Sequence, residues 1–522
     1  WSNQTWNGRM FGILQNQQRN WGLVWFEREN NKRLRCLQTP YGYLFSPTPS
    51  SPTRFPPLPA TMVKSTTKPK NNNVNSNNNN KSNNPQEETV PDIEDLFTDQ
   101  QTHVIRESLL EWYDHNRRDL PWRDPLGVEV EKEGEEGEKR AYGVWVSEVM
   151  LQQTRVQTVV GYYNRWMEKW PTLHHLAEAS LEEVNEMWAG LGYYRRARFL
   201  FEGAKMIAAT GDGFPNSASS LRNVPGIGEY TAGAIASIAF NEVVPVVDGN
   251  VIRVLARLRA ISANPKDRLT IKRFWKLAAQ VVDPYRPGDF NQSLMELGAT
   301  LCTPLNPSCS TCPISDQCRA LSISNTDETV VVTDYPAKTA KVKQRHDFSA
   351  VCVVEILESY DKIQGNQSGK FLLVKRPDGG LLAGLWEFPS VKVDKQTDSS
   401  VRRKEISRYL MKEFGLDHKK TCTLVHREDV GEFIHIFTHI RLKVYVELLV
   451  LHLKGGISSL SSIQDRENGT WKCVDSKTLS SLGLTSGVRK VYDMVQQFKE
   501  TKKSNESQLS SRKTNTKRQR HS

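Results

Sequence analysis

The sequence predicts two folded domains between disordered flanks: an all-α domain at residues 100–300, which continues into a cysteine loop at 301–320, and a separate α+β domain at 347–498. Two patterns predict them. Apolar residues recur at helical spacing in the first region, and from about residue 347 they alternate along β-branched segments. The flanks lack either period, and 522 residues are enough for two or three domains.

Charge and composition exclude some classes of protein. The formal net charge of +11 lies wholly in the flanks, with +5 in residues 1–61 and +6 in 499–522, so it carries no evidence about the folded body. No apolar run approaches the roughly 20 residues that cross a bilayer, which argues against an integral membrane protein. Eight cysteines, half of them clustered, are too few for a secreted disulfide scaffold and indicate a reducing compartment.

The N-terminal flank, residues 1–99, is expected to be disordered. Its first 61 residues are Arg-bearing and acid-poor, as organellar transit sequences are, but they are equally explained by translation upstream of Met62 or by a truncated gene model. An Asn/Lys/Ser tract follows at 64–85. At the other end, basic clusters at 512–513 and 517–520 indicate either nuclear import or a solubilising tail, and we expect a nuclear protein.

The all-α domain should contain about ten helices, because apolar residues recur every three or four positions and β-rich alternation is scarce. The clearest runs include Ile105, Leu109 and Trp112, then Val144, Val149 and Val156, then Val251, Leu255 and Leu258. One insert interrupts the pattern: residues 128–140 contain six Glu, which predicts a solvated loop. Residues 321–346 are polar and Pro-containing, and they predict a connector to the second domain.

Four cysteines at 6-2-5 spacing form the strongest single motif: Cys302, Cys309, Cys312 and Cys318. Four thiolates on a short loop repel one another unless a soft metal centre offsets their charge. The uneven spacing favours a [4Fe–4S] cluster over zinc, whose ribbon sites carry paired C-x2-C knuckles.

A second motif is the run from Leu221 to Ala232, which predicts two helices joined by a Pro-Gly-x-Gly hairpin. Gly226 and Gly228 would allow a tight turn whose amides face an anion such as a DNA phosphate. Asp248 ends an apolar run just before another helix. It is either an N-cap or a desolvated carboxylate that faces a substrate, and its position in the sequence does not separate the two.

Together these motifs resemble the endonuclease III-like superfamily, and within it the MutY-type adenine DNA glycosylases. The resemblance runs from about residue 102 to 498, and further matching segments are 118–123 (RDLPWR), 144–154 (VWVSEVMLQQT) and 190–194 (GLGYY). It implies removal of adenine paired with 8-oxoguanine, and also with guanine, from double-stranded DNA after the base is flipped out of the stack.

The resemblance also implies roles for individual residues. Glu148 would protonate the departing adenine, and Asp248 would stabilise the sugar cation. Tyr230 stands where strand-cleaving relatives carry a Schiff-base Lys, so base removal alone is expected. Asn250 and Tyr230 would line the same pocket. The remaining DNA-binding residues that the resemblance implies are the pocket wall Arg118, Leu120 and Arg123, the inserting Gln153 and Tyr193 with Leu191, and the hairpin Gly226 and Gly228.

The α+β domain resembles a Nudix fold, through residues 372–377 and 380–389. Its segment 402–413 has too few acids, among too many cations, for the Mg²⁺ cage of a Nudix hydrolase, so we expect a recognition domain. Phe437-Thr438-His439 matches the family loop that reads 8-oxoguanine, with Thr438 in place of the usual Ser; a plain β-turn is the other interpretation.

Three other functions remain open at this point: an endonuclease III-like enzyme for oxidised pyrimidines, a Nudix nucleotide phosphohydrolase, and a non-catalytic lesion binder. Tyr230 argues against the enzyme for oxidised pyrimidines, and the sparse acids of 402–413 argue against the phosphohydrolase. The presence of Glu148 and Asp248 argues against a non-catalytic binder. Arg195, Arg196 and Arg198 are expected to contribute to the DNA footprint. The protein should be monomeric, and the connector at 321–346 is the expected place for docking of repair partners.

Overall fold

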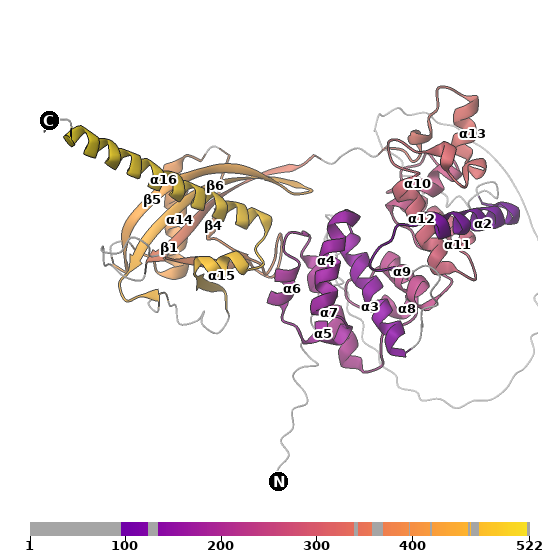
Figure 1. The fold of residues 1–522 in the computed structure, drawn as a ribbon, viewed down its shortest axis with the longest axis horizontal. Coiled ribbons are helices and arrows are strands. Elements are labelled where there is room, and N and C mark those ends of the chain that lie inside the picture. The colour runs from indigo at the N-terminus through magenta and orange to yellow at the C-terminus, as the bar shows by residue number, and fades with distance from the viewer. Residues whose placement is uncertain are drawn as a thin grey trace, which may run out of the picture. The chain divides into compact units, whose positions relative to one another are not determined.

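The computed structural model describes residues 96–123, 134–338, 343–357, 369–395, 397–417, 420–457, 460 and 469–518. It contains the predicted helical domain and the predicted sheet domain (Figure 1). All but the last four residues of the predicted disordered flank at 1–99 lie outside the described residues. No helix in the described part of the chain combines the length and the apolarity that a membrane crossing requires.

The first half of the helical domain packs around a core of large aromatic side chains that includes Trp145, Trp166 and Trp188. Sequence-encoded caps set several helix starts: Ser180, for example, forms a reciprocal capping box with Glu183. The helices are α2 (Asp99–Asn116), α3 (Gly134–Leu151), α4 (Val156–Lys169), α5 (Leu173–Glu178), α6 (Leu181–Met187), α7 (Arg195–Thr210), α8 (Ala218–Leu221) and α9 (Glu229–Phe240). Of these, α2 packs against the second core.

The second core joins α2 to the helices that follow α9, and Phe274 and Phe290 are its largest buried side chains. Three of the four motif cysteines pack against this core at its edge. The helices are α10 (Gly249–Leu258), α11 (Arg268–Val281), α12 (Pro287–Thr300) and α13 (Arg319–Thr326), with 3-10 turns η2 (Cys309–Thr311), η3 (Ser315–Gln317) and η4 (Val332–Asp334). The predicted connector at 321–346 therefore begins inside α13 and includes η4.

The sheet domain has strands in the order β3-β2-β1-β6-β5, with β4 on β1 and β7 on β2. The central pair β1 and β6 is parallel, and the other pairs are antiparallel. Helix α14 covers one face, while α15 and α16 cover the other (Figure 1). The strands are β1 (Arg345–Leu357), β2 (Lys370–Lys375), β3 (Trp386–Glu387), β4 (Ser390–Lys392), β5 (Cys422–Ile436), β6 (Ile440–Leu453) and β7 (Trp471–Val474), with α14 (Ser399–Phe414), α15 (Ser476–Ser481) and α16 (Ser486–Arg518).

The basic tail, predicted to be disordered at 499–522, is helical as far as it is described, because α16 continues to Arg518. The segment from Lys499 to Arg518 contains neither Gly nor Pro, so nothing in it stops a helix that packing has already nucleated. Its start is held to the sheet by ion pairs from Lys499 to Glu355 and from Lys502 to Glu428.

The acidic insert, predicted as a solvated loop at 128–140, is helical in its second half, where α3 begins at Gly134. Glu135 and Glu136 lie in the first turn of α3, where negative charge interacts favourably with the helix dipole. Glu138 also contacts a distant segment, because it accepts a hydrogen bond from the Phe214 amide at 3.0 Å. The first half of the insert, 128–133, lies outside the described residues.

Candidate active site

Glu148 lies in the final turns of α3, in a stretch from Ala141 to Met150 that is buried throughout. Its carboxylate accepts a 2.5 Å hydrogen bond from the Tyr230 hydroxyl, which comes from the second position of α9. Burial raises the pKa of Glu148 to about 7, and the hydrogen bond from Tyr230 opposes part of that rise. A carboxyl group with this pKa is still substantially protonated at neutral pH, as a general acid must be.

Asp248 is both the N-cap and the desolvated carboxylate that its position left undecided. Its Oδ1 accepts from the backbone amides of Asn250 and Val251 at 2.9 and 2.8 Å, and its Oδ2 accepts from the Asn250 side chain at 2.8 Å. Burial raises the pKa of Asp248, while these donors lower it. Because the charge of Asp248 also raises the pKa of Glu148, the two carboxylates lie within electrostatic reach of each other.

The predicted pocket wall is built around an acid that the sequence analysis missed. Glu296, on α12 and almost fully buried, accepts from Arg118 Nε and Nη2 at 2.5 and 2.8 Å and from Arg123 Nη2 at 2.8 Å. Leu120 between them is buried. Met295, the neighbour of Glu296, places its sulfur 3.5 Å from the Tyr230 hydroxyl. The available signal was an acid flanked by the apolar residues Leu294, Met295 and Leu297.

Asn250 also connects the site to the cysteine loop. Its Oδ1 accepts from Arg253 Nη2 at 2.8 Å, and Arg253 Nε donates to the carbonyl of Cys302 at 2.8 Å. One helical turn later, the buried Arg257 donates to Cys302 Sγ at 3.1 Å. Helix α10 thus connects the two sites: its N-cap is Asp248, and its side chains Arg253 and Arg257 bind Cys302.

The four cysteines lie close to one another. Burial raises the pKa of Cys312 to about 12, and the three other thiols add to that rise, so each lies within electrostatic range of it. The described residues contain no group of three or more His, Cys, Asp or Glu arranged around a single ion. Thiolates around a four-iron cluster each bind a different iron, so they need not converge on one point. A soft, all-thiolate donor set on one short loop fits such a cluster.

Gln153 and Tyr193, predicted to insert into DNA, are both exposed and both have left-handed backbones, with φ of 56° and 48°. Positive φ is uncommon for residues other than Gly, and it marks tight turns that hold a side chain outward. The Tyr193 hydroxyl lies 2.6 Å from the Thr438 hydroxyl, so two predicted lesion-reading residues meet. Leu191 is buried beneath this loop.

The loop that carries Thr438 is fixed by backbone contacts. Gln344 Nε2 donates to the carbonyl of Phe437 at 3.0 Å, and the His439 carbonyl accepts from the Arg345 amide at 2.9 Å. The loop joins β5 to β6, so it is a hairpin connection, as the plain-turn interpretation had it.

The two hairpin glycines differ in what they require. Gly226 has φ of +81°, and a Cβ there would lie 2.5 Å from Cβ of Phe199 on α7, so only glycine fits. Gly228 has an extended backbone and open space around it, and it is the N-cap of α9. Its place leaves the amides at the start of α9 available to an anion.

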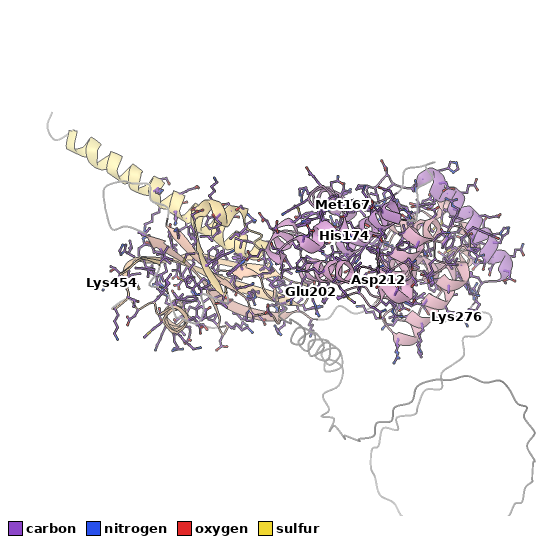
Figure 2. All side chains as sticks on the ribbon, turned by 90° about the horizontal axis from the view of Figure 1, so that it is seen from below. Met167, His174, Glu202, Asp212, Lys276 and Lys454 are labelled. Carbon is purple, nitrogen blue, oxygen red and sulfur yellow. The ribbon has the colours of Figure 1, made fainter. Side chains whose placement is uncertain are left out.

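The expected basic footprint is partly wrong. Arg196 turns inward and donates to backbone carbonyls of the protein. Arg198 forms a 2.8 Å ion pair with Glu202, which is labelled in Figure 2. Arg195 stacks on Phe199 with 4.9 Å between the guanidinium carbon and the ring centre. Of the three, Arg196 is directed toward the protein, because its guanidinium is bound by carbonyls at the end of α3 and in the loop before α7.

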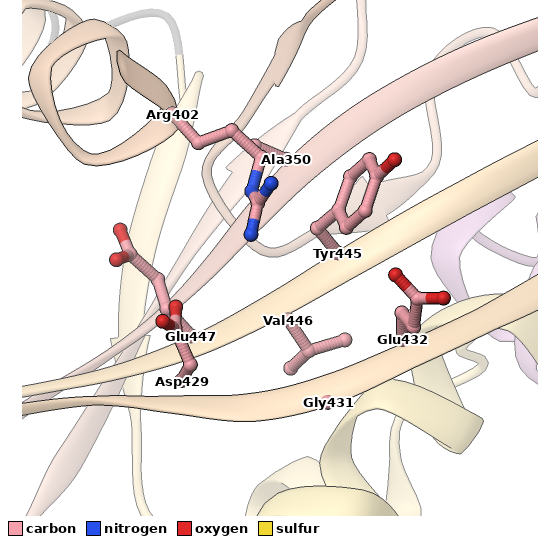
Figure 3. Close-up of a pocket in the computed structure, with 8 residues that line it drawn as sticks. All are labelled: Ala350, Arg402, Asp429, Gly431, Glu432, Tyr445, Val446 and Glu447. Carbon is pink, nitrogen blue, oxygen red and sulfur yellow. The ribbon is translucent and has the colours of Figure 1, made fainter. Parts of the chain in front are cut away.

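The sheet domain has a cavity between α14, β5 and β6, where Arg402 lies over the ring of Tyr445 (Figure 3). The acids around it come from strands rather than from the helix, and each pairs with a cation: Asp429 with Arg403, Glu432 with Lys443, and Glu447 with Arg427. Carboxylates neutralised in this way are poor Mg²⁺ ligands. The geometry therefore agrees with a recognition domain and gives no support to a phosphohydrolase.

Comparison with known proteins adds independent findings. Residues 146–280 match the family model of the HhH-GPD superfamily base excision DNA repair protein, and residues 363–494 match that of the NUDIX domain. The chain is 63% identical over 422 residues to an adenine DNA glycosylase of Arabidopsis thaliana, covering 77% of this chain and 65% of that protein. It is 45% identical to the adenine DNA glycosylase of Mus musculus, covering 68% of this chain and 72% of that protein.

Among solved structures, a non-covalent endonuclease III–DNA complex matches with a TM-score of 0.36 and 21% sequence identity. That match covers 44% of this chain and all of the other.

Proposed function

Because the chain belongs to the adenine DNA glycosylases, we propose that it hydrolyses the glycosidic bond of adenine opposite 8-oxoguanine, or opposite guanine, and leaves the strand uncut. The observation that carries this is a pair of carboxylates, of which Glu148 is buried and Asp248 is half-buried. Glu148, with its raised pKa, and Asp248, held by three nitrogen donors, have the different environments that an acid and a charge stabiliser need.

The chemistry follows from these two environments. With adenine flipped out of the stack, the Glu148 carboxyl donates its proton to N7, and the C1′–N9 bond breaks as the base leaves neutral. The Asp248 carboxylate stabilises the positive charge that develops on the sugar. Water then adds to C1′ and loses a proton, which the Glu148 carboxylate can take back, and the abasic site is complete. Hydrogen-bond partners, Tyr230 on Glu148 and Asn250 on Asp248, keep the two groups oriented through the step.

Tyr230 supports base removal without strand cleavage. A strand-cleaving relative needs an amine at this position for the imine, and a phenol cannot form one. Burial raises the pKa of Tyr230 well above its ordinary value, so its hydroxyl remains a donor to Glu148. The oxidised-pyrimidine alternative is correspondingly disfavoured.

A single gel tests the proposal. Duplex DNA with adenine opposite 8-oxoguanine is incubated with the full chain, and the sample is split with and without alkali. We expect strand breaks only in the alkali-treated half, because the product is an abasic site. Scission without alkali would contradict base removal alone, and no scission in either half would contradict the glycosylase itself.

The pH profile should follow the protonation of Glu148. Since the acid acts in its protonated form, the single-turnover rate constant should fall as pH rises through about 7. The Tyr230 hydrogen bond favours the carboxylate, so Tyr230→Phe should move this alkaline limb to higher pH. Rates measured under enzyme excess between pH 5 and 9 check both statements. An unmoved limb in the variant would show that Glu148 is not the titrating group.

We further propose that Cys302, Cys309, Cys312 and Cys318 hold a [4Fe–4S] cluster, which in this place would fix the loop 302–318 against α10. The carbonyl and sulfur of Cys302 already accept hydrogen bonds from Arg253 and Arg257. The purified protein should be brown, with the broad visible absorption of an iron–sulfur centre. Colourless, active protein loaded with zinc would refute this assignment.

The nuclear location and the docking of repair partners on the connector also remain proposals. The basic clusters at 512–513 and 517–520 support import, and the exposed, polar residues Asp327, Glu328 and Thr329 support docking.

A further inference from the structure

Arg196, at the second position of α7, binds backbone carbonyls of two separate segments, the end of α3 and the loop before α7. Its Nη1 donates to the carbonyls of Val149, Met150 and Gln152 at 2.8, 3.0 and 2.5 Å. Its Nη2 donates to the Gly192 carbonyl at 3.2 Å and lies 3.4 Å from the Thr154 hydroxyl. One guanidinium therefore joins the end of α3 to the loop before α7.

The carbonyls at the end of α3 have no partner within that helix, and a cation at a helix C-terminus meets both the unpaired oxygens and the negative end of the dipole. Among the described contacts of Arg196, every acceptor is a neutral oxygen and none is a carboxylate. Burial lowers its pKa to about 10, so the side chain stays charged at neutral pH. It serves as a cap for the helix that carries Glu148.

Each of the two segments carries a residue that should enter the DNA. Gln152 precedes Gln153, and Gly192 precedes Tyr193, and both inserting residues have the left-handed φ noted above. The Arg196 guanidinium also lies 5.4 Å from the centre of the Tyr193 ring. The two carbonyls that Arg196 binds are thus each one peptide away from an inserting side chain.

We propose that Arg196 is a positioning residue that holds Gln153 and Tyr193 at a fixed separation, so that both enter the base stack together. The inference rests on the proposed function, since insertion matters only if the chain acts on a base pair in duplex DNA. Arg196 itself does not touch DNA in this role, and its effect on excision passes through the two loops.

The test compares Arg196→Gln with Arg106→Gln in the full chain. Arg106 is a matched control, because it also caps a helix end through backbone carbonyls, those of Gln280, Val281 and Val282, at 2.8 to 3.0 Å. We expect Arg196→Gln to lower single-turnover excision of adenine opposite 8-oxoguanine by roughly 10- to 100-fold, the cost of misplacing a group by about 1 Å. Arg106→Gln should lower the melting temperature but leave excision within about 2-fold of wild type.

A second background separates positioning from general stability. In a Gln153→Ala/Tyr193→Ala chain, adding Arg196→Gln should cost less than about 3-fold, since its two targets are already gone. An equal loss in both backgrounds would overturn the proposal. Arg196→Lys, which keeps the charge but lacks the planar fork that spans both loops, should fold and still lose excision. Full activity in Arg196→Lys would also overturn it, and inactive wild type would instead refute the proposed function.

Discussion

Asp248→Asn should lower the single-turnover rate constant for adenine excision by about 1,000-fold or more, within the range that charge stabilisation of a transition state supplies. An Asn oxygen can still accept from the amides of Asn250 and Val251, so the cap on α10 survives. What is lost is the negative charge that faces the developing sugar cation. Alkali-treated gels under enzyme excess measure the rate.

The chain offers a close control for this change in Asp267. Asp267 caps α11 through the amides of Leu269 and Thr270 at 3.0 and 3.2 Å. Asp267→Asn repeats the chemical change at a cap with no other duty, and excision should stay at the wild-type rate. If both variants lost activity equally, capping rather than charge would explain the role of Asp248.

Glu148→Gln should lower the same rate constant by about 100- to 10,000-fold, because a glutamine cannot donate the proton that the leaving adenine requires. The amide can still accept from the Tyr230 hydroxyl, so the local packing is kept. The residual activity should also lose the fall in rate near pH 7, since the titrating group is absent. Both quantities come from single-turnover rates across the pH range.

Glu355→Gln is the matched variant for this experiment. Glu355 is equally buried, at 6% exposure, but lies on β1 with Lys499 at 2.5 Å. It should excise adenine at the wild-type rate and retain the alkaline fall. A Glu148→Gln chain that kept more than a tenth of the wild-type rate would assign the acid to another group.

Much of the site was predictable because its chemistry is written in short segments. Glu148 in an apolar helix, Asp248 ahead of α10 and the glycine hairpin are local patterns, and the burial of Glu148 follows from its apolar neighbours. The two domains were predictable for the same reason, since helical and alternating periods are local. The cluster and the reading of 8-oxoguanine remain predictions.

Other features depend on contacts between distant segments, which a local pattern does not encode. Glu296 binds Arg118 across 178 residues of sequence, so nothing near either residue announces the pair. Arg196 lies in an arginine-rich segment that is typical of a phosphate contact. In the structure, however, its guanidinium donates to three backbone carbonyls some 45 positions earlier in the chain. The tail after Lys499 has the composition of a disordered segment, but α16 arrives already folded and extends through it.

The contact between Gly226 and Phe199 has a thermodynamic consequence. Phe199 lies on α7 three residues after Arg196, so the hairpin that should bind phosphate rests on the helix whose first turn ties the two inserting loops together. If binding of the hairpin to the DNA phosphates favours one position of α7, the same position also favours insertion of Gln153 and Tyr193. Such coupling is reciprocal: a mispair that accepts the inserting residues tightens the hold on the phosphates by the same factor. Undamaged DNA, whose base stack does not admit the two side chains, is then bound with lower affinity and dissociates sooner.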